Sequence, residues 1–350
     1  MNDLSINKYR KQLMGIAAIG VLLVHSRNII VLPKSVSELF SYGGIGVYIF
    51  VFLSSIGLYS SLKTRGGGYS KIEFYKRRFK RAFVPYLLIA GTWYGVKYIL
   101  IQHDILAFFY ELSTLSFWID HQGAWYVAML FPIYLIFPYF FDWIEGGRQK
   151  KVIRDSKIIG IAVIIFVIAS VVSLFDMQLY SHLSQVFSSV IVYIIGYYCA
   201  EKVMTDKYNG WLFGAICIVF YVMKAVTPLK TFDVINNISW SLLAVPIITV
   251  LTWFLSKVNS KIMNDFFGFF GKHSLEMYLW NIFLIQAIEY SGFIELFENQ
   301  YGDRYGYISY GLVIAVGIIL SVVYGKISDA IASITCRPPV LNCKRKMNKK

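Results

Sequence analysis

Charged residues are scarce in this chain of 350 amino acids, of which only 15% are Asp, Glu, Lys or Arg. Soluble domains carry about a quarter of such residues. Hydrophobic residues make up 57% of the chain and aromatic residues 17%. Because so little charge cannot keep so much apolar surface in water, the composition excludes a soluble protein and predicts an integral membrane protein.

Cysteine is also rare, with four in the whole chain. Cys199 and Cys217 fall in apolar segments, whereas Cys336 and Cys343 fall in the basic C-terminal tail. This distribution forms neither a disulfide framework nor the paired spacing of a metal site, so we expect no bound metal. Long polar loops are missing too, and we therefore expect no second soluble domain.

Long apolar runs dominate what remains, and each is close to the roughly 20 residues that a bilayer core requires. They lie near 12–32, 42–62, 82–102, 124–144, 158–175, 183–204, 210–227, 239–257, 272–290 and 308–328. The pattern predicts an all-α, polytopic membrane protein of about ten transmembrane helices. Residues 1–335 are expected to form one membrane domain, followed by a basic tail over 336–350, and 105–118 to form a short interfacial or re-entrant helix.

Positive charge is distributed unevenly among the predicted loops. Ten helices place almost all of the basic clusters on one side, including KTRGGGYSKIEFYKRRFKR and GGRQKKVIRDSK. The loop over 103–123, on the opposite side, has three acidic residues and no Lys or Arg. By the positive-inside rule, both termini are therefore predicted to be cytoplasmic. Topology and contact with anionic headgroups explain the net charge of +14, and no nucleic-acid partner is expected.

The first apolar run, QLMGIAAIGVLLVHSR, ends with His25 in its outer half. An ionisable side chain at membrane depth is costly, and it is by default a functional candidate. The unperturbed histidine pKa of about 6.5 suits a general base near neutral pH. Contact with a neighbouring helix, or a cap at the outer interface, is the alternative explanation.

Arg77, Arg78 and Arg81 lie in the segment FYKRRFKRAFVPY, which precedes the third apolar run. Planar guanidinium groups bind phosphate oxygens in pairs, so these residues are candidates for binding a phosphorylated ligand from the cytosol. Glu276, one turn into GKHSLEMYLWN, is the expected partner of these arginines. The alternative is an anchor that contacts lipid headgroups.

Asp120, His121, Trp125 and Tyr126 lie in IDHQGAWYV, at the outer end of the fourth run. Acidic and aromatic side chains together suit a sugar, whose hydroxyls need acceptors and whose CH face stacks on rings. The aromatic belt at the membrane interface explains Trp125 and Tyr126 equally well without a ligand.

Five runs resemble, in order, the signatures of the membrane acyltransferase-3 family of bacterial O-acyltransferases. They are GIAAIGVLLVH, GVYIFVFLSSIGLYSSL, YKRRFKRAFVPYLL, AWYVAMLFPIYLIFPYF and GKHSLEMYLWNIFLI. The resemblance implies a ten-helix enzyme in the bacterial inner membrane. Such an enzyme moves an acyl group, usually acetyl, from cytosolic acyl-CoA to a hydroxyl of a cell-surface or lipid-linked glycan.

The resemblance also assigns roles to residues of this chain. His25 matches the essential histidine, and the arginines at 77–81 match positions near the CoA phosphates. Acetyl-CoA is then a co-substrate, and no permanently bound cofactor is expected. The family arginine that precedes the histidine by eleven residues is replaced by Met14. Lys11, one turn lower, is expected to take its place at the donor site.

The mechanism expected from these residues is general-base catalysis by His25, with Ser26 or Tyr126 stabilising the oxyanion. The alternative function is a transporter or flippase for a glycolipid or a small solute. In that case His25, Arg27, Lys97 and Glu276 would form a proton relay. Acceptor-dependent release of CoA distinguishes the two functions.

Overall fold

The computed structural model describes residues 5–27, 29, 32–65, 69–121, 123–147, 150–292 and 305–335. Its helices in the first half of the chain are α1 (Ile6–Ser26), α2 (Lys34–Ser41), η1 (Tyr42–Gly44), α3 (Ile45–Lys63), α4 (Lys71–Arg78), η3 (Phe79–Phe83), α5 (Val84–Tyr94), η4 (Gly95–Ile101), α6 (Ile105–Leu112), α7 (Leu115–Asp120) and α8 (Trp125–Glu145). In the second half they are α9 (Lys151–Phe175), α10 (Met177–Met204), α11 (Gly210–Val226), η5 (Pro228–Thr231), α12 (Asp233–Leu242), α13 (Ala244–Val258), α14 (Lys261–Lys272), α15 (Ser274–Tyr290) and α17 (Tyr305–Thr335). The described chain contains no strand, and the predicted all-α class is confirmed.

Seven helical segments of the described chain are long and apolar enough to cross a bilayer. They are Lys34–Lys63, Lys71–Ile101, Trp125–Glu145, Lys151–Phe175, Met177–Met204, Asp233–Val258 and Tyr307–Ile331. A polytopic membrane protein is thereby confirmed. The other three predicted spans correspond to α1, α11 and α15, which are not among the seven, so the number ten stays a prediction. The predicted tail over 336–350 lies outside the described residues.

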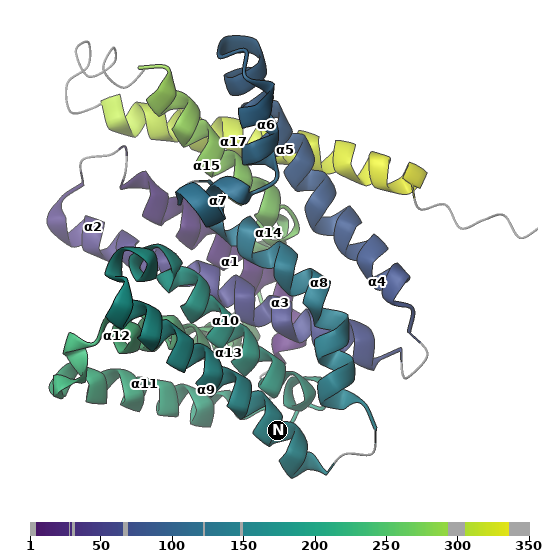
Figure 1. Cartoon of the computed structure of the whole chain (residues 1–350), viewed down its shortest axis with the longest axis vertical. Coiled ribbons are helices and arrows are strands. Elements are labelled where there is room, and N and C mark those ends of the chain that lie inside the picture. The colour runs from purple at the N-terminus through teal and green to yellow at the C-terminus, as the bar shows by residue number, and fades with distance from the viewer. Residues whose placement is uncertain are drawn as a thin grey trace, which may run out of the picture.

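The helices form two groups around a central set (Figure 1). Helices α1, α3 and α8 lie in the middle, with α9–α13 on one side of them and α4–α6, α15 and α17 on the other. The apolar outer surface supports a lipid environment, since α9 exposes Ile159, Val163 and Val167 along its length. The predicted short segment at 105–118 is two short helices, α6 and α7, separated at Thr114.

Glycines allow α1 to pack closely against two neighbouring helices. A Cβ atom at Gly46 of α3 would overlap the carbonyl of Ala17, and one at Gly271 of α14 would overlap the carbonyl of Lys11. Small residues permit such backbone contact between membrane helices. The contacts of Gly46 with Ala17 and of Gly43 with Gly20 show that α1 and α3 run antiparallel.

The first helix differs from the predicted span at both ends. It begins at Ile6 and ends at Ser26, whereas the apolar run predicts 12–32. Its first two turns contain Lys8, Arg10 and Lys11, which are polar but helical. Hydrophobicity marks the part of a helix that lies in lipid, and it does not reveal a polar extension of the same helix.

Candidate active site

A cavity of about 480 Å³ lies between α1, α3, α8, α14, α15, α17 and the helix formed by α4, η3 and α5. Three of its walls are stripes of residues spaced by four: Arg10 and Met14 on α1, Phe50, Ser54 and Leu58 on α3, and Tyr126, Leu130 and Tyr134 on α8. Residues four apart share one face of a helix, so each stripe runs along the length of the cavity. The cavity therefore has two distinguishable ends.

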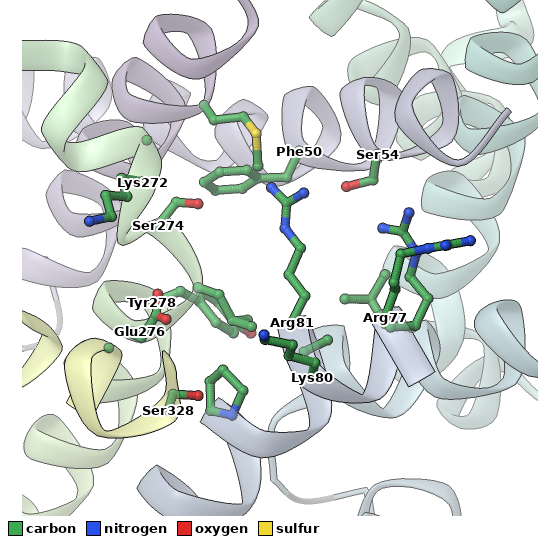
Figure 2. Close-up of a pocket in the computed structure, with 18 of the residues that line it drawn as sticks. Phe50, Ser54, Arg77, Lys80, Arg81, Lys272, Ser274, Glu276, Tyr278 and Ser328 are labelled. Atoms are coloured by element: carbon green, nitrogen blue, oxygen red, sulfur yellow. The ribbon is translucent and has the colours of Figure 1, made fainter. Parts of the chain in front are cut away.

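Positive charge gathers at the end marked by Arg10 and Tyr134. The cationic side chains that line the cavity are Arg10, Arg77, Arg78, Lys80, Arg81 and Lys272. Among the described residues, two carboxylates, Glu276 and Asp329, line it with them. Figure 2 shows Arg77 on one side, Ser274, Glu276 and Tyr278 on the other, and the Arg81 side chain between them. Arg81 lies in η3, a π-helical turn of the kind that is frequent at functional sites.

Several guanidinium N–H groups of this cluster have no hydrogen-bond partner among the described residues. They are Nε of Arg10, Nη2 of Arg77 and Nε of Arg78. Arg77 lies 3.6 Å from Glu73, and Arg78 donates to Ser61 at 3.4 Å. The Arg78 guanidinium also lies over the rings of Phe74 and Tyr134. Because buried polar groups are normally satisfied, the free donors point to an anion with several oxygens.

Aromatic rings from three helices close the opposite end of the cavity. Tyr126 of α8 lies between Phe50 of α3 and Tyr278 of α15, with ring centroids 6.5 Å and 5.4 Å apart. All three side chains are buried. They form an aromatic layer, and we name the region below this layer the donor cavity.

The structure brings together most of the predicted donor residues. Arg77, Arg78, Arg81 and Glu276 all line the donor cavity, although no ion pair joins Glu276 to an arginine in the described chain. Lys11 is exposed and does not line the cavity.

Arg10, which is not among the residues predicted from the sequence, occupies the place expected for Lys11. Four residues turn a helix by about 400° and leave Arg10 about 40° from Met14, whereas Lys11 lies about 60° away. This periodicity is the signal that identifies Arg10 from the sequence. The side chain of Arg10 reaches α3, where a Cβ at Gly57 would overlap its guanidinium group.

His25 lies at the other end of α1, in its last turn, and does not line the donor cavity. It is eleven residues beyond Met14, or about 16 Å along the helix. One turn before His25, the carbonyl of Leu22 accepts a hydrogen bond from the Tyr310 hydroxyl, which itself accepts one from Asn281 at 3.2 Å. These contacts fix the last turn of α1 against α15 and α17.

The predicted acceptor residues do not form one cluster. The Ser26 hydroxyl donates to the carbonyl of Leu23 at 2.6 Å, so its proton is already used within α1. Tyr126 is part of the aromatic layer of the donor cavity, and Trp125 precedes it at the start of α8. Asp120 is exposed at the end of α7.

The surroundings of Asp120 are nevertheless polar. Burial and a hydrogen bond with Asp120 raise the pKa of Tyr110 to about 12. The ring of the neighbouring His121 packs at a tilt against that of His182, with ring centroids 3.9 Å apart. This part of the chain presents hydrogen-bonding groups beside the start of α8.

Comparison with known proteins identifies the family of this chain. A model described as an acyltransferase domain matches residues 12–325, which is most of the chain. No curated protein and no solved structure matches the chain. The chain therefore belongs to the acyltransferase-3 family and is a multi-pass membrane acyltransferase.

Proposed function

We propose that the protein transfers an acyl group, in the first place acetyl, from cytosolic acyl-CoA to a hydroxyl of a cell-surface or lipid-linked glycan. The observation that carries this proposal is the donor cavity, where six cationic side chains face two carboxylates. Acyl-CoA carries several phosphates on one side of a long, thin arm. Guanidinium groups bind such phosphates bidentately, and they do so best where water is largely excluded.

His25 acts in this proposal as the general base. It takes the proton of the acceptor hydroxyl while the hydroxyl oxygen attacks the thioester carbonyl. The tetrahedral intermediate then collapses, the C–S bond breaks, and the imidazolium returns the proton to the leaving thiolate. The products are the O-acyl ester and free CoA, so that atoms and charge balance.

The thioester has to pass the aromatic layer to meet His25, because the layer ends the donor cavity below Ala17, Ala18 and Val21. Opening therefore requires Phe50, Tyr126 or Tyr278 to change rotamer. Lid and side-chain motions of this kind commonly accompany substrate binding.

The test uses purified protein with labelled acetyl-CoA and bacterial glycans as acceptors. Release of CoA that depends on the acceptor is the expected result. His25→Ala should abolish transfer while a labelled CoA analogue still binds. Transfer by this variant at the wild-type rate contradicts the general-base role. Absence of CoA binding by the wild type contradicts the donor assignment.

A further inference from the structure

A second cavity, of about 410 Å³, lies where four membrane helices end. It is bordered by the last residues of α3, α8 and α10 and by the first turn of α9. Its charged lining residues are Lys63, Lys151, Arg154, Lys202 and Lys207, with Glu145, Asp155 and Glu201. Five cations therefore face three carboxylates, on the side of the membrane predicted to be cytoplasmic.

Glu145 is fully engaged within the protein. It accepts from Lys63 at 2.8 Å and from Arg154 at 2.7 Å. The hydroxyls of Tyr59 and Tyr197 also donate to it, at 3.4 Å and 3.3 Å. These four contacts leave the carboxylate no need of a further cation.

Arg154 also engages the other two carboxylates. Its Nη1 atom lies 3.3 Å from Asp155 and 3.3 Å from Glu201. Its Nη2 atom has no hydrogen-bond partner among the described residues, although the residue is only 9% exposed. A buried guanidinium N–H without an acceptor indicates that an oxygen atom belongs beside it.

Three lysines supply the excess positive charge. Lys151, Lys202 and Lys207 form no ion pair in the described chain. Lys151 is the first residue of α9, a helix whose start has no side-chain cap. The free N–H groups of a first helical turn, together with the helix dipole, favour an anion at this position.

We infer that this cavity binds a phosphate group, and that its source is the headgroup of an anionic phospholipid. The cavity lies at the ends of membrane helices, at the depth where headgroups are found. Directly beside it, α9 exposes the apolar residues Val152, Ile159 and Val163, along which acyl chains can lie. Basic pockets between membrane helices on the cytoplasmic side bind such headgroups.

The test compares retained lipids in the intact, detergent-solubilised protein by native mass spectrometry, using phosphatidylglycerol and phosphatidylcholine as probes. Lys151→Gln with Lys207→Gln is the test variant. Lys257→Gln with Lys261→Gln removes two exposed lysines from the same side of the membrane, and it is the matched control. A parallel arm measures the effect of inorganic phosphate on the melting temperature of each protein.

We expect the wild type and the control to retain phosphatidylglycerol about ten-fold better than phosphatidylcholine, and the test variant to lose this preference. Stabilisation of the wild type by inorganic phosphate that the test variant loses, without retention of phosphatidylglycerol, would support the phosphate site and replace the lipid as its source. Equal retention by test variant and wild type, with the same response of both proteins to inorganic phosphate, overturns the inference. If the double variant does not fold, Lys207→Gln alone serves the same comparison.

Discussion

Arg10, Arg78 and Arg81 place like charges within one cavity, where they repel one another. Arg10 and Arg78 are half-buried and therefore poorly solvated, whereas Arg81 is exposed. Burying a charge without a partner costs several kcal/mol, and an anion bound between the three groups removes much of that cost. Gly57 of α3 leaves room for the Arg10 guanidinium, because a Cβ atom at position 57 would overlap it. A cavity lined by these groups is therefore well suited to phosphate.

Arg10→Gln should weaken binding of the donor far more than Lys11→Gln. A hydrogen bond to a charged group contributes about 1.5–3 kcal/mol, so the KM for acetyl-CoA is expected to rise by at least about ten-fold in Arg10→Gln. Lys11 is exposed outside the cavity, and its variant should stay within about two-fold of wild type. Initial rates of CoA release against acetyl-CoA concentration measure both values. A larger rise in KM for Lys11→Gln than for Arg10→Gln would assign Lys11 to the donor site.

The types of residue at the donor site could be predicted from the sequence. Which individual residues belong to the site could be predicted only in part. The arginines at 77, 78 and 81 are recognisable from the sequence because three guanidinium groups within five residues are unusual beside an apolar run. Arg10 is identifiable only when its angle on the helix is compared with that of Met14. Phe50 and Tyr134 have no signal at all, since aromatic residues are common throughout this chain.

At the scale of helices, the aromatic layer is built where α3, α8 and α15 meet. Each helix contributes one ring, and each ring continues a stripe of cavity-lining residues on its own helix. The layer separates the cationic end of the cavity from the upper part of α1 and from His25. Under the proposed function, we expect this barrier to keep water away from the thioester until the acceptor is present.

Phe50→Ala should increase the hydrolysis of acetyl-CoA without abolishing acyl transfer. Removing the ring opens a path for water, so hydrolysis of acetyl-CoA without acceptor is expected to rise several-fold while transfer continues. CoA release measured with and without glycan detects this change. Phe166→Ala, on the lipid-facing side of α9, is the matched control. Unchanged hydrolysis in Phe50→Ala would show that the layer is not the barrier.

Gly271→Ala should destabilise the protein, because α14 packs on α1 with backbone against backbone. The new methyl group would overlap the carbonyl of Lys11, and neither atom is at the end of a flexible side chain. Overpacking of this kind costs about 1–3 kcal/mol. The melting temperature in detergent is expected to fall by several degrees. Gly91→Ala, where a Cβ meets nothing within 4 Å, should leave it unchanged.

Helices could be predicted more reliably than their ends and irregularities. Every apolar run overlaps a described helix, because lipid requires that backbone groups be satisfied within each segment. The π-helical turns over Phe79–Phe83 and Gly95–Ile101 could not be predicted, since no residue type specifies an i→i+5 turn. Contacts between helices, such as that of Gly271 with α1, depend on packing that one sequence does not reveal.

At the scale of the whole molecule, the basic ends of the helices line two charged cavities. The start of α1, the arginine segment and the end of α17 meet at the donor cavity, while the ends of α3, α8 and α10 meet at the second one. Basic segments that are far apart in the sequence thus lie at the same end of the bundle. This arrangement is what the positive-inside rule requires of a cytoplasmic face.

Single cysteines, introduced after the four native ones are replaced, should reveal ten crossings. A membrane-impermeant maleimide added to intact cells is expected to label Asp176→Cys and Ser291→Cys, and to leave Ser5→Cys, Asp206→Cys and Ser260→Cys unlabelled until the cells are lysed. The reason is the charge of the flanking segments, since translocating a basic cluster is unfavourable. Labelling at Ser260 from outside would mean that α11 does not cross, and protection of Ser291 would mean the same for α15. External labelling at Ser5 with protection of Asp206 would remove α1 from the spans, and His25 would then lie outside the membrane path between donor and acceptor.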